Sequence, residues 1–122
     1  MSKTILVVDD SASIRQVVGM TLTQAGYHVI EASDGRQALE KATSSRVDAV
    51  ITDLNMPVMD GLTFIRQFRS SPSSTGVPIV FLTTESDESV KAEAKQAGAT
   101  GWMIKPFKQD QLLAVVRKGA GA

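Results

Sequence analysis

Acidic side chains follow two short apolar runs of this sequence, at the point where each run ends. Asp9 and Asp10 come directly after the run Thr4–Val8, and Asp53 follows the run Ala49–Thr52. Carboxylates beside a buried core cost free energy unless a counter-charge or a cation lies next to them. These positions therefore pose a choice between solvated strand ends and a cation site.

A cation site becomes the better choice if the three carboxylates meet. At roughly 5 Å and an effective dielectric constant near 20, each pair repels by about 3 kcal/mol, which a single lysine does not offset. The nearby ligands are hard oxygens, without histidine or cysteine, which favours magnesium, calcium or manganese over zinc. A metal, Lys105 and the hydroxyl of Thr83 or Thr84 around a third carboxylate would form a site for phosphoryl transfer.

The elements that must carry these residues alternate regularly along the chain. The apolar runs predicted to be strands are Thr4–Val8, Tyr27–Ala32, Ala49–Thr52, Pro78–Thr83 and Gly101–Ile104. The four later stretches with helical spacing are Gly35–Thr43, Gly61–Arg69, Glu88–Ala97 and Gln109–Lys118. Such alternation predicts an α/β fold, a parallel sheet with helices on both faces. Ligands in such folds bind at the carboxyl ends of the strands, so the acids, hydroxyls and lysine should converge on one rim.

The first helix is predicted from one apolar stripe that follows two serines. The stripe consists of Ile14, Val17, Val18, Leu22 and Ala25. Ser11 or Ser13 can cap its start, and Gly26 ends it. Asp60 can cap the third helix, where Gly61 is interpreted as a permissive turn or first-turn residue, and Gly98 closes the fourth. The terminal GAGA is expected to fray.

Composition narrows the class of protein. The 122 residues are 43% hydrophobic and 21% charged, and thirteen basic residues balance thirteen acidic ones. These values predict one domain, residues 1–122, without a net field that attracts nucleic acid or an anionic membrane. The absence of cysteine favours a reducing compartment, and no leader or bilayer-spanning segment is evident, so we expect a cytoplasmic protein.

Four separated motifs, VVDD, TDLNMPVMDG, LTTE and KPF, occur in an order and spacing that resemble the receiver domain of bacterial two-component response regulators. The resemblance covers nearly the whole chain and is strongest to the stand-alone, CheY-like members of the family. It implies a flavodoxin-like, doubly wound (βα)5 fold. The implied strand order, 2-1-3-4-5, is that of CheY, a known example of this topology, and is taken over from the family.

The resemblance also implies roles for single residues. Asp53 would accept a phosphoryl group from a histidine kinase, with Thr83 hydrogen-bonded to that group and Lys105 in contact with it. The implied ligands of magnesium, which manganese could replace, are Asp9, Asp10, Asp53 and the backbone carbonyl of Asn55. Such a domain is a signalling phosphoacceptor and no enzyme in the usual sense, because it catalyses only its own phosphorylation and dephosphorylation.

Other residues are expected to control access to the phosphoryl group and the conformational switch that it triggers. Phosphoryl access and lifetime are assigned by the resemblance to Asn55, Thr84 and Glu85. Trp102 stands where receivers usually carry a tyrosine or phenylalanine switch, and its bulk restricts the usual inward swing. Strand alternation places Trp102 and Lys105 on opposite faces, so the indole should lie beside the fourth helix. A cis peptide bond is implied before Pro106.

The expected partners are proteins. The family places its output surface at roughly residues 85–118, where this sequence mixes acidic and basic side chains, which suits a protein better than nucleic acid. The flagellar motor switch is the first expectation, in chemotaxis, and a phosphotransfer protein of a phosphorelay the second. We expect a monomer that binds no membrane.

Two other classes remain open. A small magnesium-dependent phosphohydrolase of the haloacid dehalogenase type is suggested by the spacing of Asp53 and Asn55, but it would need a further acid late in the chain. A flavodoxin-like flavin binder would present hydroxyls and amides to a phosphate, where this sequence presents Asp9 and Asp10. Turnover of a generic phosphatase substrate, or a yellow colour, would reveal either class.

Overall fold

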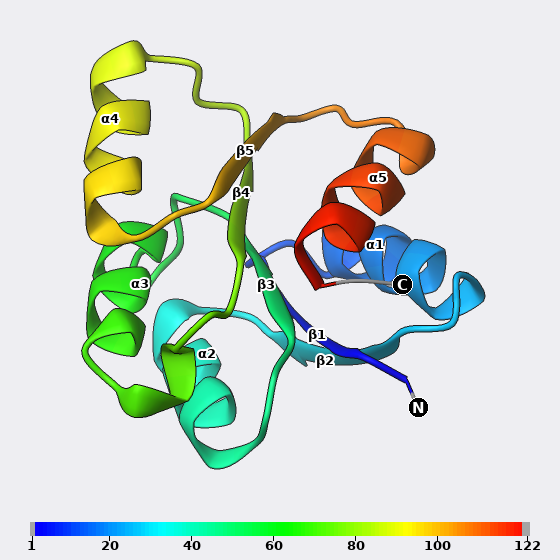
Figure 1. Cartoon of the computed structure of the whole chain (residues 1–122). Coiled ribbons are helices and arrows are strands. Elements are labelled where there is room, and N and C mark those ends of the chain that lie inside the picture. Colours follow the sequence, from blue (N-terminus) through cyan, green and yellow to red (C-terminus); the bar gives the residue numbers. More distant parts are fainter. Residues whose placement is uncertain (1, 121–122) are drawn as a thin grey trace.

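The computed structural model describes residues 2–120, which form a parallel sheet covered on both faces by helices (Figure 1). Its strands are β1 (Thr4–Val8), β2 (His28–Ala32), β3 (Ala49–Thr52), β4 (Ile79–Thr83) and β5 (Gly101–Ile104). Its helices are α1 (Ala12–Gln24), α2 (Gly35–Ser44), α3 (Gly61–Arg69), the 3-10 turn η1 (Pro72–Ser74), α4 (Glu88–Ala97) and α5 (Gln109–Ala120). The alternation of strands and helices predicted from the sequence is confirmed.

The strand order is β2-β1-β3-β4-β5, and all neighbours are parallel, which confirms the fold class. The chain first moves outward from β1 to β2 and then crosses back to β3 on the other side of β1. Val8, the last residue of β1, pairs with Ala32 of β2 and Thr52 of β3. Strands β1 and β3 therefore end level with each other at the point where the strand order reverses, which is where such folds bind ligands.

The two faces of the sheet hold separate cores, as the strands predict by being apolar on both sides. Leu6 and Val8 pack with residues of α2, α3 and α4, among them Phe64. Ile5 and Val7 pack with residues of α1 and α5. Figure 1 shows the same division, with α1 and α5 together and α2, α3 and α4 together. Because both faces of β1 are dry, the strand reads as a continuous apolar run.

Helix α1 begins as predicted, but one residue of its stripe was assigned wrongly. The side chain of Ser11 accepts a hydrogen bond from the backbone N–H of Ile14 at 3.3 Å and caps the helix, whereas Ser13 lies within it. Val18 and Leu22 are fully buried, but Val17 is 47% exposed. Successive helical residues are about 100° apart, so Val17 points away from the face that Val18 presents to the sheet.

The last helix extends further than predicted. Helix α5 runs to Ala120, which packs against the core that α1 and α5 share, so Gly119 and Ala120 belong to the helix. The other two residues of the GAGA tail lie outside the described residues. Within the described part of the chain, no helix combines the length and apolar character needed to cross a bilayer.

Candidate functional site

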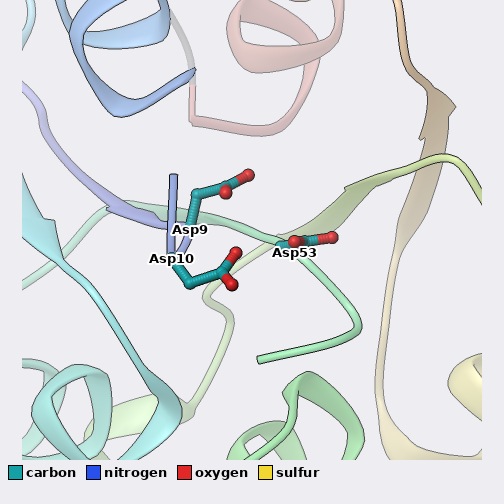
Figure 2. A group of neighbouring side chains, drawn as sticks. All are labelled: Asp9, Asp10 and Asp53. Carbon is teal, nitrogen blue, oxygen red and sulfur yellow. The ribbon is translucent and has the colours of Figure 1, made fainter. Parts of the chain in front are cut away.

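Three carboxylates meet at the carboxyl ends of β1 and β3 (Figure 2). Asp9 and Asp10 follow β1, and Asp53 follows β3, its neighbour in the sheet. Each residue offers an oxygen within 4.8 Å of the other two, and Figure 2 shows all three carboxylates extending toward the same side. The convergence that the sequence predicts is therefore present.

Backbone hydrogen bonds continue the sheet by one residue and thereby position the acids. The N–H of Asp9 donates to the carbonyl of Ala32 at 3.1 Å, and the N–H of Asp53 donates to the carbonyl of Val8 at 2.8 Å. Both Cα atoms thus sit on the rigid edge of the sheet instead of on a free loop. Rigid elements hold site residues more accurately than loops do.

Lys105 reaches the acids from the end of β5. Its Nζ lies 2.7 Å from Asp9 Oδ2 and 3.5 Å from Asp53 Oδ2. Its backbone N–H donates to the carbonyl of Thr83 at 2.8 Å, which continues the pairing of β4 and β5. The Lys105–Pro106 peptide bond is cis, the isomer that the resemblance implies. In this arrangement the ammonium group is shared by two acids and lies nearer to Asp9.

The three acids differ in their surroundings. Asp9 is 2% exposed and Asp53 9% exposed, whereas Asp10 is exposed. Burial, and next the charge of Asp9, raise the pKa of Asp53 above its usual value, while Lys105 and the N–H of Leu54 oppose that shift. Among residues 2–120, the side chain of Asp10 has neither a hydrogen-bond nor an ion-pair partner.

The donor set fits a hard divalent cation. The cluster contains three carboxylates and one ammonium group, so negative charge remains after Lys105 is counted. Oxygen ligands of this kind suit magnesium, which takes one or two carboxylates and keeps several waters. Asp10 has a free carboxylate to offer, while both oxygens of Asp9 are already hydrogen-bonded. Asn55 lies exposed two residues after Asp53, and its carbonyl as a further ligand stays a prediction.

The hydroxyl and aromatic residues lie in a connected segment. Thr83 is 1% exposed at the end of β4, whereas Thr84 is exposed. The side chain of Thr83 accepts a hydrogen bond from the N–H of Glu85 at 3.2 Å, and the carbonyl of Glu85 accepts one from the indole N–H of Trp102 at 3.0 Å. The backbone of Glu85 therefore links the candidate phosphoryl-binding hydroxyl to the aromatic ring.

Trp102 lies beside α4, as predicted. Its ring is 5.5 Å from that of Phe81, and Nζ of Lys91, on α4, is 6.0 Å from the ring centroid. Lys105 instead turns toward Asp9, so the strand separates the indole from the acidic site. The indole is thus placed to report on the α4 side and not on the cation.

The sequence interpretation missed Arg15, which braces the first acidic loop. Its Nη1 donates to the backbone carbonyl of Asp9 at 2.6 Å, and its Nε contacts Glu31 Oε1 at 3.2 Å. The N–H of Ser11 donates to Asp9 Oδ1 at 2.9 Å, so this acid is held from several sides. Arg15 is the one charged residue within Ala12–Gln24, and that isolation was the available signal.

Gly61 turns out to be required for a close approach and not for turn flexibility. It is the first residue of α3, after the cap Asp60, and its φ is not positive. A Cβ at this position would lie 2.3 Å from the carbonyl oxygen of Asp53. The interpretation as a first-turn residue is confirmed, and the permissive-turn alternative is wrong.

Comparison with known proteins agrees with this geometry. The family model described as the response regulator receiver domain matches residues 5–117. The response regulator MprA of Mycolicibacterium vanbaalenii is 42% identical over 113 residues, which are 93% of this chain and 48% of that protein. The alkaline phosphatase synthesis transcriptional regulatory protein PhoP of Bacillus subtilis is 38% identical over 117 residues, 96% of this chain and 48% of that protein. The chain thus spans about half the length of these curated relatives.

Solved structures are similar over nearly their whole length. The chemotaxis protein CheY4 of Vibrio cholerae is 46% identical with a TM-score of 0.94, and the match covers 98% of this chain and 99% of that one. The receiver domain of the sensor histidine kinase PA1611 from Pseudomonas aeruginosa is 31% identical with a TM-score of 0.91, and the match covers both chains completely. That structure has a magnesium ion coordinated in its active-site cleft.

Proposed function

Since this chain belongs to the response regulator receiver family, we propose that it is a phosphorylation-controlled switch in which Asp53 accepts the phosphoryl group. Receivers take this group from histidine kinases and act on downstream partners. The observation that carries the proposal is the meeting of Asp9, Asp10 and Asp53 with Lys105 at one edge of the sheet. As in other receivers, the chain is a signalling phosphoacceptor and not a classical enzyme.

The transfer itself uses Asp53 as the nucleophile. One carboxylate oxygen of Asp53 forms a bond to phosphorus while the bond from phosphorus to the donor nitrogen breaks, and the donor imidazole leaves. Magnesium, with manganese as a possible replacement, would be held by Asp9, Asp10, Asp53 and the carbonyl of Asn55. When bound, it would neutralise charge on the phosphoryl oxygens. Lys105 is 3.5 Å from Asp53 and would contact the new group, with Thr83 as its hydrogen-bond donor.

Asn55, Thr84 and Glu85 would control how easily water and phosphodonors reach the group. Asn55 and Thr84 are exposed, and the carboxylate of Glu85 accepts a hydrogen bond from the N–H of Asp87 at 3.2 Å. Their side chains therefore belong to the solvent side of the site and not to the core. Differences in phosphoryl lifetime among receivers would then arise from such positions without a change in fold.

We place the output in chemotaxis, through the surface formed by α4, β5 and α5. The support is the similarity to the chemotaxis protein CheY4 of Vibrio cholerae, which is 46% identical with a TM-score of 0.94. The partner would be a protein such as the flagellar motor switch. The alternative is an intermediate receiver of a phosphorelay, which would pass the group to a phosphotransfer protein.

A phosphorylation assay tests the proposed function. Incubated with magnesium and a small phosphodonor such as acetyl phosphate, the protein should gain one phosphoryl group that resists acid and is lost in base, as an acyl phosphate is. Intact-mass spectrometry measures the gain. Many turnovers of a generic phosphatase substrate would indicate a phosphohydrolase instead. A pull-down of partner proteins with and without beryllofluoride would show whether the chain binds the flagellar motor switch or a phosphotransfer protein.

Substitution of Asp10 should affect the metal and leave the fold intact. Asp10→Ala removes an exposed carboxylate that has no partner among the described residues, so the metal-free free energy of unfolding should change by less than about 0.5 kcal/mol. Magnesium affinity should fall by roughly tenfold or more, and phosphorylation should slow. Calorimetric titration and urea unfolding measure the two effects.

The control for Asp10→Ala is Glu40→Ala, which removes an exposed acid on α2, away from the site. It should leave magnesium affinity within about twofold of wild type. A fall of several kcal/mol in the metal-free stability of Asp10→Ala would mean that this acid is structural.

Trp102 should report switching. Beryllofluoride added with magnesium mimics the phosphoryl group. If Thr83 contacts this group, its hydrogen bond with the N–H of Glu85 would change and Glu85 would move. The carbonyl of Glu85 accepts a hydrogen bond from the indole of Trp102, so the indole would respond. The emission of Trp102 should therefore change in wavelength or intensity, whereas magnesium alone should do little. Asp53→Ala titrated in parallel should show no change. An unchanged wild-type spectrum, with mimic binding established independently, would exclude Trp102 from the switch.

A further inference from the structure

The loop of residues 54–60, between β3 and α3, is tied to the structure at both ends. At its start the carbonyl of Leu54 accepts a hydrogen bond from the N–H of Gly61 at 2.8 Å. Near its end the carbonyl of Met59 accepts one from the N–H of Gly35 at 3.0 Å. Gly35 is the first residue of α2 and comes from a different part of the sequence, so α2 supports the loop that carries Asn55.

The loop contains a strained turn at Val58. The N–H of Met59 donates to the carbonyl of Pro57 at 2.7 Å, and the φ of Val58 between them is +70°. A three-residue turn with positive φ is the rare and strained γ form, and a β-branched residue is poorly suited to it. Val58 is 76% exposed, so packing of its own side chain does not hold it there. Such strain persists only where neighbouring groups over-determine the conformation.

Gly35 is the neighbouring group that holds this conformation. A Cβ on Gly35 would lie 2.4 Å from the carbonyl oxygen of Met59 and 2.9 Å from its Cγ. The φ of Gly35 is not positive, so glycine is needed here for close approach and not for backbone freedom. The obstructing atom belongs to the backbone, which cannot turn aside as the end of a flexible side chain can.

The start of α2 is itself well anchored. The side chain of Asp34 accepts a hydrogen bond from the N–H of Gln37 at 2.9 Å, and the side chain of Gln37 accepts one from the N–H of Ser33 at 3.1 Å. Ala38, one turn later, is fully buried against the sheet. The N–H of Gly35 therefore lies at a well-anchored helix start, from which it donates to the carbonyl of Met59.

We propose that Gly35 is a positioning residue for the magnesium site, which acts through the Met59 carbonyl and the turn at Val58 to hold the backbone carbonyl of Asn55 in place. The proposal rests on the proposed function, because it assumes that Asn55 is a ligand. It predicts that a residue outside the acidic cluster, on another helix, sets metal affinity. Groups that orient metal ligands from the second layer typically change affinity by 10–100-fold when altered.

The test compares two glycine-to-alanine changes on buried helical positions. Gly35→Ala pushes the Met59 carbonyl away, whereas a Cβ on Gly19 of α1 would meet only Val29 Cγ1, at an ordinary 3.7 Å. Magnesium binding is measured by calorimetric titration at a temperature where circular dichroism shows both variants folded. Gly35→Ala should bind magnesium about tenfold more weakly than wild type, and Gly19→Ala within about twofold.

The outcomes separate this proposal from the proposed function. Suppose that folded Gly35→Ala binds magnesium with the wild-type affinity, while Asp10→Ala binds it more weakly. The positioning role of Gly35 is then wrong, but the assignment of the magnesium site stands. If wild type binds no magnesium, the metal site itself is wrong, and the positioning role falls with it.

A measurement on the wild type applies even if Gly35→Ala does not fold. In a magnesium titration of ¹⁵N-labelled protein, the amide resonance of Gly35 should shift. The dissociation constant fitted to that shift should equal the one that calorimetry gives for the magnesium site. The amide of Gly76, whose surroundings are open and which lies in the loop before β4, should stay in place. A Gly35 amide that remains unshifted at saturation would overturn the proposal.

Discussion

Asp53→Asn should take up no phosphoryl group from a small phosphodonor in the presence of magnesium. The amide oxygen of asparagine is not a nucleophile, so incorporation should fall to background, a loss of at least roughly 100-fold. Asp53 is the acid that the N–H of Leu54 and the ammonium group of Lys105 orient. Intact-mass spectrometry before and after base treatment measures the loss.

The matched control is Asp48→Asn. Asp48 precedes β3 and accepts a hydrogen bond from the N–H of Thr4, at the start of β1 and therefore at the opposite edge of the sheet. It should be phosphorylated as wild type is. Labelling of Asp53→Asn at the wild-type level would disprove the assignment of the phosphoacceptor.

The substitution Asp53→Asn should also change how the stability of the metal-free protein depends on pH. The pKa of Asp53 is raised in the folded protein, chiefly by burial and next by the charge of Asp9, above the ordinary value of 3.8 for an aspartate. A raised folded-state pKa contributes stability below the unfolded pKa, and this contribution is lost as pH rises through the folded-state value. Metal-free Asp53→Asn should therefore gain in free energy of unfolding relative to wild type as the pH rises.

Urea unfolding between about pH 4 and pH 7 measures that difference. It should be smallest at the acid end and grow as the pH rises through the raised folded-state pKa of Asp53. A difference that shrinks as the pH rises would mean that Lys105 outweighs burial and the charge of Asp9.

Of the substitutions proposed, Lys105→Ala should lower the stability of the metal-free protein most. The ammonium group lies 2.7 Å from Asp9 and 3.5 Å from Asp53, and its removal leaves two buried acids without their counter-charge. Breaking a buried pair costs about 3–5 kcal/mol, so the free energy of unfolding should fall by about 3 kcal/mol. Magnesium affinity should rise by roughly tenfold, because the cation no longer competes with the ammonium group for Asp9.

In Lys105→Ala, phosphorylation of Asp53 should no longer raise the affinity for the partner. Asp53 keeps its nucleophilic carboxylate, so some labelling should remain, but the group that senses the new charge is gone. Trp102 emission should then respond weakly to beryllofluoride with magnesium, and partner affinity should no longer rise on phosphorylation. Arg46→Ala, which removes an exposed basic side chain before β3 and outside the output surface, serves as the control. A normal rise in partner affinity for Lys105→Ala would refute the sensing role.

Much of the architecture follows from local patterns in the sequence. The bounds of β1, β3, β5, α3 and α4 agree with the predicted ranges, because each is an apolar or amphipathic run with clear ends. The caps could also be predicted, since Ser11 and Asp60 act on backbone groups three residues away. The strand order was taken from the family resemblance, because periodicity does not say which strands are neighbours.

The arrangement of the site was predictable only in part. That Asp9, Asp10 and Asp53 share one rim follows from parallel strands, whose carboxyl ends lie at the same edge. That Val17 faces solvent depends on how α1 is rotated against the sheet, which a stripe with one additional apolar residue leaves open. A pattern of apolar residues records which face of a helix can be buried, and packing against the other elements selects the face.

The sequence by itself determined which chemical groups stand at the ends of the strands. Only the tertiary structure decided which atoms meet: Lys105 lies nearer to Asp9, 96 residues away, than to Asp53, and Gly35 donates to Met59. Spacing along the chain sets the side of an element on which a residue lies. Contacts between distant elements depend on the register, rotation and backbone separation that the whole packed core fixes together.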